Sequence, residues 1–117
     1  MARTAIAVQV IPKNTELDDI TFSAGDAANN HYWLNSGKEI LLMKSTNGSL
    51  AAVVDSVADE HGRTGDVTLT PGAGEISAAG PFDPAVWNQR GASDLGRVHM
   101  DIADATNVTF AVVRFAT

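Results

Sequence analysis

The strongest constraint on the fold is a repeated alternation of apolar and polar residues in short runs that turn residues separate. In one such run the alternation places Val98, Met100 and Ile102 on one face of an extended chain, because successive strand side chains point to opposite sides. Val67 and Leu69 repeat the pattern earlier in the chain. About eight such runs occur, at the spacing typical of an all-β sandwich or barrel.

Residues 39–44 (EILLMK) form a continuous apolar run instead. Such a run predicts a strand in the centre of a sheet, with cover on both faces. The pair Asn47–Gly48 follows it and strongly favours a tight hairpin turn. Residues 50–57 fit helical spacing, but they also fit a strand that pairs with residues 39–44 across this turn. The hairpin signal and the valines favour the strand.

In the last predicted strand, which begins near Val108, the apolar residues change from even-numbered to odd-numbered positions. Val108, Phe110 and Val112 share one face, whereas Val113 and Phe115 fall on the other. Either both faces are covered there, or a bulge near Val112 and Val113 resets the face.

The stretch GPFDPAVWNQRG, residues 80–91, holds two of the four prolines and one of the two tryptophans. Pro81 and Pro84 fix their own φ angles and bias the preceding residues toward extended geometry. We therefore expect a rigid corner that places Phe82 on the core and starts the next strand. Trp87 points either into its own sandwich or into a neighbouring subunit.

The length of 117 residues indicates a single domain, with a strand or an extended arm in residues 1–25 and the sandwich in residues 26–117. The apolar, alternating run at residues 5–10 suits the addition of a strand to a neighbour's sheet edge. Alternatively, it is the first strand of its own sheet. On the first interpretation the residues that contact a partner are Ala5, Ile6, Val8 and Val10.

Charge and composition exclude several classes of partner. The net charge of −6 opposes binding to phosphate backbones, so we expect no nucleic-acid partner. The chain has no cysteine, which leaves no disulfide framework or thiolate metal site. Apolar runs fall short of the ~18 residues of a membrane span. The first residues lack a signal-peptide core, so we expect synthesis inside the cell and no membrane partner.

The search for catalytic chemistry finds no convincing set of residues. His31, His61 and His99 lie far apart without metal-ligand spacing, so each is interpreted as a surface or loop histidine. Neighbouring carboxylates are expected to be solvated rather than catalytic, since acid–base work requires a shaped cleft. These carboxylates are Asp18–Asp19, Asp59–Glu60 and Asp101–Asp104. We predict no catalytic, cofactor-binding or metal site, and therefore no enzyme.

The aromatic residues offer candidate binding positions. Trp33 and Trp87 lie in or beside polar loops, where such rings either plug the end of a sandwich or anchor a partner. Trp87 with Asn88 also fits a platform that stacks against a sugar. The predicted interface therefore includes Trp33, Trp87 and Asn88.

Three segments present their motifs in a distinctive order. Residues 26–49 contain an Asn-x-Gly-Lys turn, an apolar strand and a lysine. Residues 65–89 contain a strand, a turn, a second strand and a Gly-Pro-Phe corner followed by proline, an aromatic residue and asparagine. Residues 96–115 contain two strands joined by an Asp/Ala/Thr turn. In this order the chain resembles small virion structural proteins of tailed bacteriophages, of the capsid decoration (head-stabilising or cement) kind.

The resemblance implies a jelly-roll or β-tulip-like β-sandwich on the capsid exterior. It further implies a homotrimer that binds the major capsid protein and stabilises the shell, without a cofactor. Similar small β-domains serve as tail or connector components of the virion, so these roles stay open. The tryptophans keep a carbohydrate- or receptor-binding domain as a further alternative.

Overall fold

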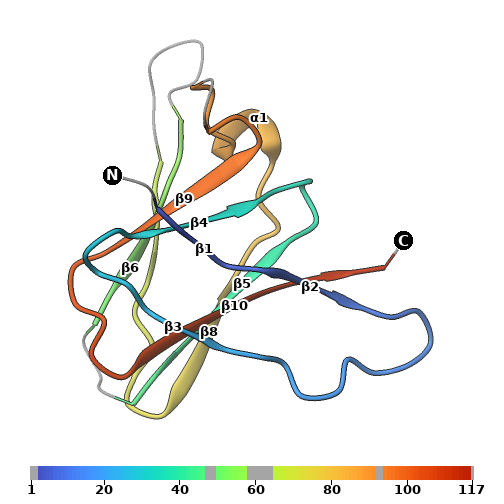
Figure 1. Cartoon of the computed structure of the whole chain (residues 1–117), viewed down its shortest axis with the longest axis horizontal. Coiled ribbons are helices and arrows are strands. Elements are labelled where there is room, and N and C mark those ends of the chain that lie inside the picture. The colour runs from blue at the N-terminus through green and yellow to red at the C-terminus, as the bar shows by residue number, and fades with distance from the viewer. Residues whose placement is uncertain (1–2, 47–49, 58–64, 92–93, 117) are drawn as a thin grey trace.

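Two β-sheets pack face to face in the chain, which a computed structural model describes at residues 3–46, 50–57, 65–91 and 94–116 (Figure 1). The first sheet has the order β1 (Thr4–Ala5), β4 (His31–Leu34), β9 (Arg97–Ile102), β6 (Ala52–Asp55) and β7 (Val67–Leu69). The second has the order β2 (Val8–Ile11), β10 (Val108–Phe115), β5 (Ile40–Ser45) and β8 (Glu75–Ala79), and β3 (Ser23–Ala24) also pairs with β10. The predicted β-sandwich is confirmed. The described residues form ten strands rather than about eight, because β1 and β3 are only two residues long.

The core lies between the two sheets. Val98, Met100 and Ile102 of β9 are buried, as the alternation predicts, and they belong to one cluster with Phe110 and Val112 of β10. Such a layer of interdigitating apolar side chains is what holds a two-sheet sandwich together.

The parity change in β10 does not come from a bulge. Its pairing with β5 runs without interruption from Val108 to Val113. Ala111 and Val113, on the opposite face from Phe110, are also buried. Both faces of the strand are therefore covered up to Val113, and only beyond it does Phe115 become 59% exposed.

The apolar run at residues 39–44 forms β5, which lies between β10 and β8. Its predicted central position is confirmed. Leu41 and Met43 are completely buried, whereas Ile40 and Leu42 on the other face are half-buried. The second face therefore has less cover than the sequence predicts.

Residues 50–57 contain the strand β6, so the strand interpretation is confirmed there. The predicted hairpin with residues 39–44 is wrong, because β6 pairs with β9 and β7 in the first sheet while β5 belongs to the second. The chain therefore crosses from the second sheet to the first between β5 and β6. The apolar face of each of these strands is buried against the facing sheet. The Asn47–Gly48 pair lies outside the described residues.

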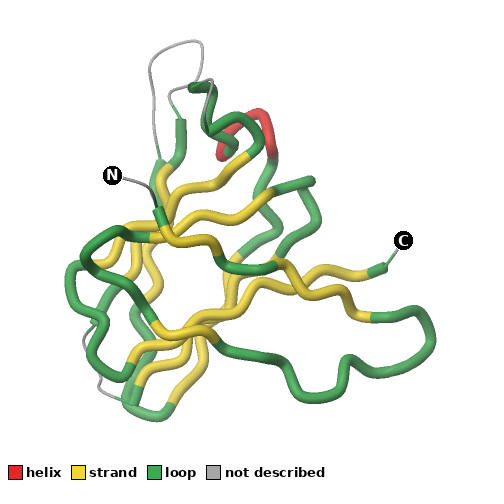
Figure 2. The backbone as a smooth tube through the Cα atoms, in the orientation of Figure 1, coloured by secondary structure: helices red, strands yellow, loops and turns green. Residues whose placement is uncertain are grey.

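The proline-bracketed corner lies at one end of the sandwich, where Figure 2 shows the helix α1 (Pro84–Trp87). Phe82 is 2% exposed, which confirms its predicted place on the core. The expectation that a strand starts here is wrong. Asp83 accepts a hydrogen bond from the Ala85 N–H at 2.9 Å and Pro84 takes the first helical position, so both residues favour a helical turn.

Candidate interface between the sheet edges

The N-terminal residues cross from one sheet to the other. β1 pairs in parallel with β4 in the first sheet, and β2 pairs in parallel with β10 in the second. Between them Ile6 is buried at 3% exposure, and its N–H donates to the Tyr32 carbonyl at 2.9 Å. The ends of residues 5–10 therefore belong to two strands of the chain's own sheets, separated by Ile6 and Ala7, which matches the second of the two interpretations.

A groove of about 420 Å³ opens where this segment crosses between the sheets. Ala5, Ile6 and Val8 line it from the N-terminal segment, and Trp33 and Leu34 line it from β4. The structure thus brings four of the predicted interface residues together in one place. Trp33 contributes a buried wall at 1% exposure, whereas Leu34 is 63% exposed at the rim.

The second sheet projects past the first beside this groove. Figure 1 shows β2 and the end of β10 extending to the right of the other strands. Val10 lies opposite Arg114 in this projection and is 38% exposed. We define the apolar edge as Ala5, Val8, Val10 and Leu34, which offer apolar surface to solvent or to a partner.

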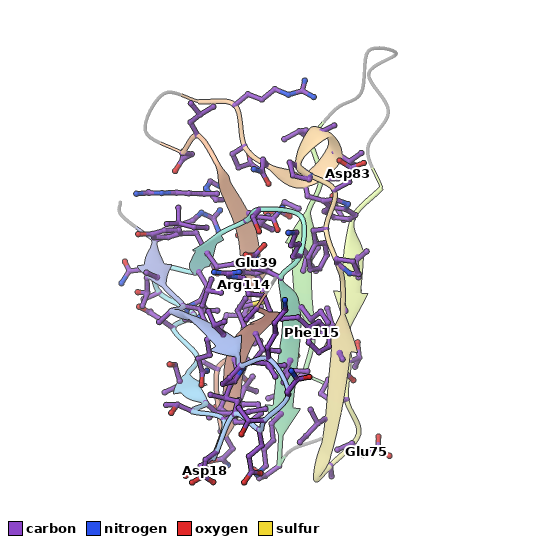
Figure 3. All side chains as sticks on the ribbon, turned by 90° about the vertical axis from the view of Figure 1, so that its right-hand side faces the viewer. Asp18, Glu39, Glu75, Asp83, Arg114 and Phe115 are labelled. Carbon is purple, nitrogen blue, oxygen red and sulfur yellow. The ribbon has the colours of Figure 1, made fainter. Side chains whose placement is uncertain are left out.

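A buried carboxylate forms part of the groove wall. Glu39 is 3% exposed, and it accepts hydrogen bonds from the Ser36 N–H at 2.6 Å and the Ser36 hydroxyl at 2.9 Å. The Arg114 Nε lies 3.8 Å from its other oxygen (Figure 3). Burial works to raise the pKa of Glu39, but the hydrogen bonds outweigh it and hold the pKa below its usual value. The groove therefore contains a fixed, locally neutralised negative charge.

Sequence reasoning missed Glu39, Leu34 and Arg114 as parts of this site. The Ser-x-x-Glu spacing of Ser36 and Glu39 is known from helix starts, where the glutamate accepts from the N–H three residues earlier, so it could signal this hydrogen bond but not the place of Glu39 in a groove. Leu34 and Arg114 carry no such signal, because only the sheet pairing brings them to the groove.

The remaining predicted residues serve the fold itself. The Trp87 ring meets Phe82 edge-on with centroids 5.2 Å apart, and Phe82 contacts Trp33 at 5.6 Å. Trp87 therefore packs against its own core. The Asn88 side-chain oxygen accepts from the Asn35 amide at 2.7 Å, which ties the corner to the end of β4. The structure does not bring Trp87 or Asn88 into the groove, which neither residue lines.

The histidines and carboxylates differ from expectation in several places. His31 is 1% exposed in β4, so its interpretation as a surface or loop residue is wrong. Its inward position is tolerated because both ring nitrogens have polar backbone partners. His99 is half-buried in β9 rather than in a loop. His61, Asp59 and Glu60 lie outside the described residues.

A cluster of charged groups occupies the outer face of the first sheet. Asp55 lies opposite His99 and diagonal to Asp101, because β6 and β9 pair with Val53 opposite Asp101. Burial, together with the hydrogen bond to Asp101, raises the pKa of Asp55 to about 7. Burial also opposes ionisation of Asp101, but its hydrogen bonds with Asp55 and Arg3 outweigh this and lower the pKa of that carboxyl. The two carboxyls therefore share a proton below neutral pH.

Replacing Asp55 with asparagine is expected to stabilise the protein at about pH 8 by on the order of 1 kcal/mol, and to have no such effect at about pH 4. The pKa of Asp55 is raised in the fold, so the folded state binds more protons than the unfolded chain between the ordinary value of 3.8 and about 7. The free energy of unfolding of the wild type falls with rising pH across that window. Urea denaturation at the two pH values measures the difference.

Asp104→Asn is the matched control for this prediction. Asp104 is an exposed carboxylate whose hydrogen bonds from Thr106 lower its pKa. Removing the charge of Asp104 is expected to bring no gain in the free energy of unfolding at about pH 8. An equal gain in both variants would mean that only the reduced net charge matters.

Within the described ranges, no group of three or more histidine, cysteine, aspartate or glutamate side chains is arranged to hold a metal ion. None of the described helices is long and apolar enough to cross a membrane. Comparison of the chain with protein-family models, curated proteins and solved structures found no match.

Proposed function

We propose that this protein is a non-enzymatic structural component of a tailed-phage virion, and specifically a decoration protein that binds the outer capsid surface and stabilises the shell. The ordered motifs of residues 26–116 motivate the proposal. The observation that carries it is the apolar edge, where Leu34 is 63% exposed and Val10 is 38% exposed beside an open groove. An open groove between sheet edges, with exposed apolar residues beside it, suits a protein partner.

The proposed partners are the major capsid protein and further copies of this chain in a homotrimer. Repeated copies on a shell multiply a modest affinity per contact, so a small interface on each subunit is sufficient. Closed symmetry would present the same edge from every subunit. The net charge of −6 favours solubility and disfavours the packaged nucleic acid as a partner.

Co-sedimentation with mature capsids of the phage that encodes the chain tests this function. Saturable binding, with the protein sedimenting as a trimer before it binds, would support the proposal. A monomer that leaves capsids unbound would overturn it. Binding to purified tails instead of capsids would move the role to a tail or connector component.

Leu34→Asp is expected to weaken capsid binding at least tenfold while the free energy of unfolding changes little. Leu34 is exposed in the free protein, so a carboxylate there stays solvated until a partner would bury it. Ile76→Asp is the matched control, because Ile76 is 54% exposed on β8, at the opposite edge of the second sheet from β2. Equal binding by both variants would exclude the apolar edge as the contact.

The carbohydrate-binding alternative has less support than the capsid role, because one of its two tryptophans is buried. A stacking platform requires a fully exposed ring, but Trp33 is 1% exposed, and Trp87 is half-buried with its ring in edge contact with Phe82. The capsid role is therefore the function that the described residues support best.

A further inference from the structure

The parallel pairing of β1 with β4 ends early, beside the groove. Its last matched residues are Ala5 and Tyr32, and its last backbone hydrogen bond runs from the Ile6 N–H to the Tyr32 carbonyl at 2.9 Å. The chain then leaves the first sheet and joins the second as β2, while β4 continues to Leu34 (Figure 1). The end of β4 therefore has a neighbouring strand on the β9 side only.

The backbone of Leu34 points to the side without a neighbour. The Asn35 N–H donates to the Gly96 carbonyl at 3.0 Å, so Asn35 and, two residues earlier, Trp33 direct their backbone groups toward β9. The alternation of an antiparallel ladder then directs the N–H and the C=O of Leu34 away from β9. Among the residues that the structure describes, none hydrogen-bonds to either group. Both groups are therefore available to another extended chain.

The second sheet has a similar free edge at β2. The Ala116 N–H donates to the Ile11 carbonyl at 2.9 Å, so Ile11 faces β10 and, by alternation, Val8 and Val10 face away from it. No described strand pairs with this outer edge of β2. Val8 and Leu34 both line the groove, so unpaired strand backbone borders it from both sheets.

The charges of the groove suit an uncharged occupant. Glu39 and Arg114 are the charged members of its described lining, and they face each other with the Arg114 Nε 3.8 Å from the carboxylate. A further charged side chain would upset this balance and would lose its own hydration in the groove. β2 also has none of the charged side chains that commonly protect an exposed sheet edge from pairing. The electrostatic match therefore favours an uncharged, apolar segment.

We propose that the groove accepts an extended, uncharged segment of a partner protein, which occupies the place beside β4 that this chain leaves after Ile6. The segment accepts from the Leu34 N–H and donates to the Leu34 carbonyl, and its apolar side chains lie against Trp33 and Val8. This is strand addition, with main-chain hydrogen bonds for affinity and pockets for alternate side chains. A helix cannot fill this role, because its backbone groups are already paired within the helix.

The direction of strand addition is opposite to the one that the N-terminal sequence suggests. Residues 5–10 do not reach out to a neighbour, since they contribute to the chain's own two sheets. The chain is instead the acceptor, and the partner supplies the strand. The identity of that partner as the major capsid protein rests on the proposed function, whereas the preference for an extended segment is testable without capsids.

A peptide titration followed by NMR tests the preference in the full chain. The probe is a capped hexapeptide of alternating valine and threonine, and it is expected to shift the Leu34 and Val8 amides while those of the β6–β7 pairing stay unchanged. Two further peptides carry methyl groups on the nitrogens of either the valines or the threonines, so they keep every side chain but lose backbone donors. At least one of them should bind about tenfold more weakly. No shift with the first peptide, or equal binding by all three, would overturn the proposal.

Leu34→Pro and Leu34→Ala carry the test to capsids. Both variants lose the leucine side chain, but only proline removes the N–H, and it leaves the ladder with β9 intact because that N–H faces the free edge. In co-sedimentation Leu34→Pro is expected to bind about tenfold more weakly than Leu34→Ala. Equal binding by the two folded variants would contradict strand addition, and if Leu34→Pro does not fold, the peptide titration decides. A wild type that binds the peptide at Leu34 but not capsids would overturn the proposed function and leave this inference standing.

Discussion

Replacing Gly80 with alanine is expected to lower the free energy of unfolding by about 3 kcal/mol. Gly80 has φ of +122°, a conformation that residues with a Cβ atom rarely adopt. A Cβ atom there would lie 2.8 Å from the Glu39 carbonyl oxygen and 3.2 Å from the Ile40 Cα. Both are backbone atoms at the start of β5, so neither can turn aside as a flexible side chain would. Urea denaturation followed by tryptophan fluorescence measures the loss.

Two other glycines serve as controls that separate the conformational cost of a positive φ from the steric clash of the added Cβ. Gly74 also has a positive φ, of +78°, but no atom lies within 4 Å of its added Cβ, so Gly74→Ala retains only the conformational cost of about 1 kcal/mol. The added Cβ of Gly65 likewise meets nothing within 4 Å, and no positive φ is present, so Gly65→Ala should be nearly neutral. If Gly80→Ala were no worse than Gly74→Ala, the close approach of the corner to β5 would contribute nothing.

The inward faces of the strands were predictable because strand periodicity is a local property of the chain. Val98, Met100 and Ile102 alternate with polar residues, and all three are buried. Leu69 follows the same rule on β7, and Phe82 reaches the core from the corner that the prolines define. In each case the pattern needs no knowledge of which strand lies alongside.

The assignment of strands to sheets was not predictable in the same way. A turn signal after β5 predicts that the chain reverses its direction there. After such a reversal the next strand can pair with β5 in the same sheet or join the facing sheet. Both outcomes bury the same apolar residues. The pairing of β6 with β9 depends on residues more than forty positions later, so no local pattern could specify it.

The candidate interface was predictable only for the N-terminal segment and for Trp33, which the sequence places beside a polar loop. Ala5, Ile6 and Val8 follow from the apolar alternation of one segment. Leu34 and Arg114 join them through the pairing of β4 with β1 and of β10 with β2, which places residues eighty positions apart beside one groove. The carboxyl pair of the outer face has the same origin, since it depends on the register between β6 and β9.

Phe82→Ala is expected to cost about 3–5 kcal/mol of unfolding free energy, the largest loss among these variants. The ring is 2% exposed and lies between Trp33, at 5.6 Å, and Trp87, at 5.2 Å between centroids. Truncation leaves a cavity that the rigid corner cannot close, and it removes both aromatic contacts. Urea denaturation measures the cost, and near-ultraviolet circular dichroism should show the altered surroundings of the tryptophans.

Phe115→Ala is the control that separates burial from the loss of a phenyl ring. Phe115 is 59% exposed at the end of β10, so the same substitution should change the unfolding free energy by about 0.5 kcal/mol or less. Phe82→Leu should fall between the two, because it fills most of the cavity but loses the ring edges that Trp33 and Trp87 contact. If Phe82→Ala cost no more than Phe115→Ala, the corner would not be packed on the core. The proline-bracketed stretch would then be free to contact a partner.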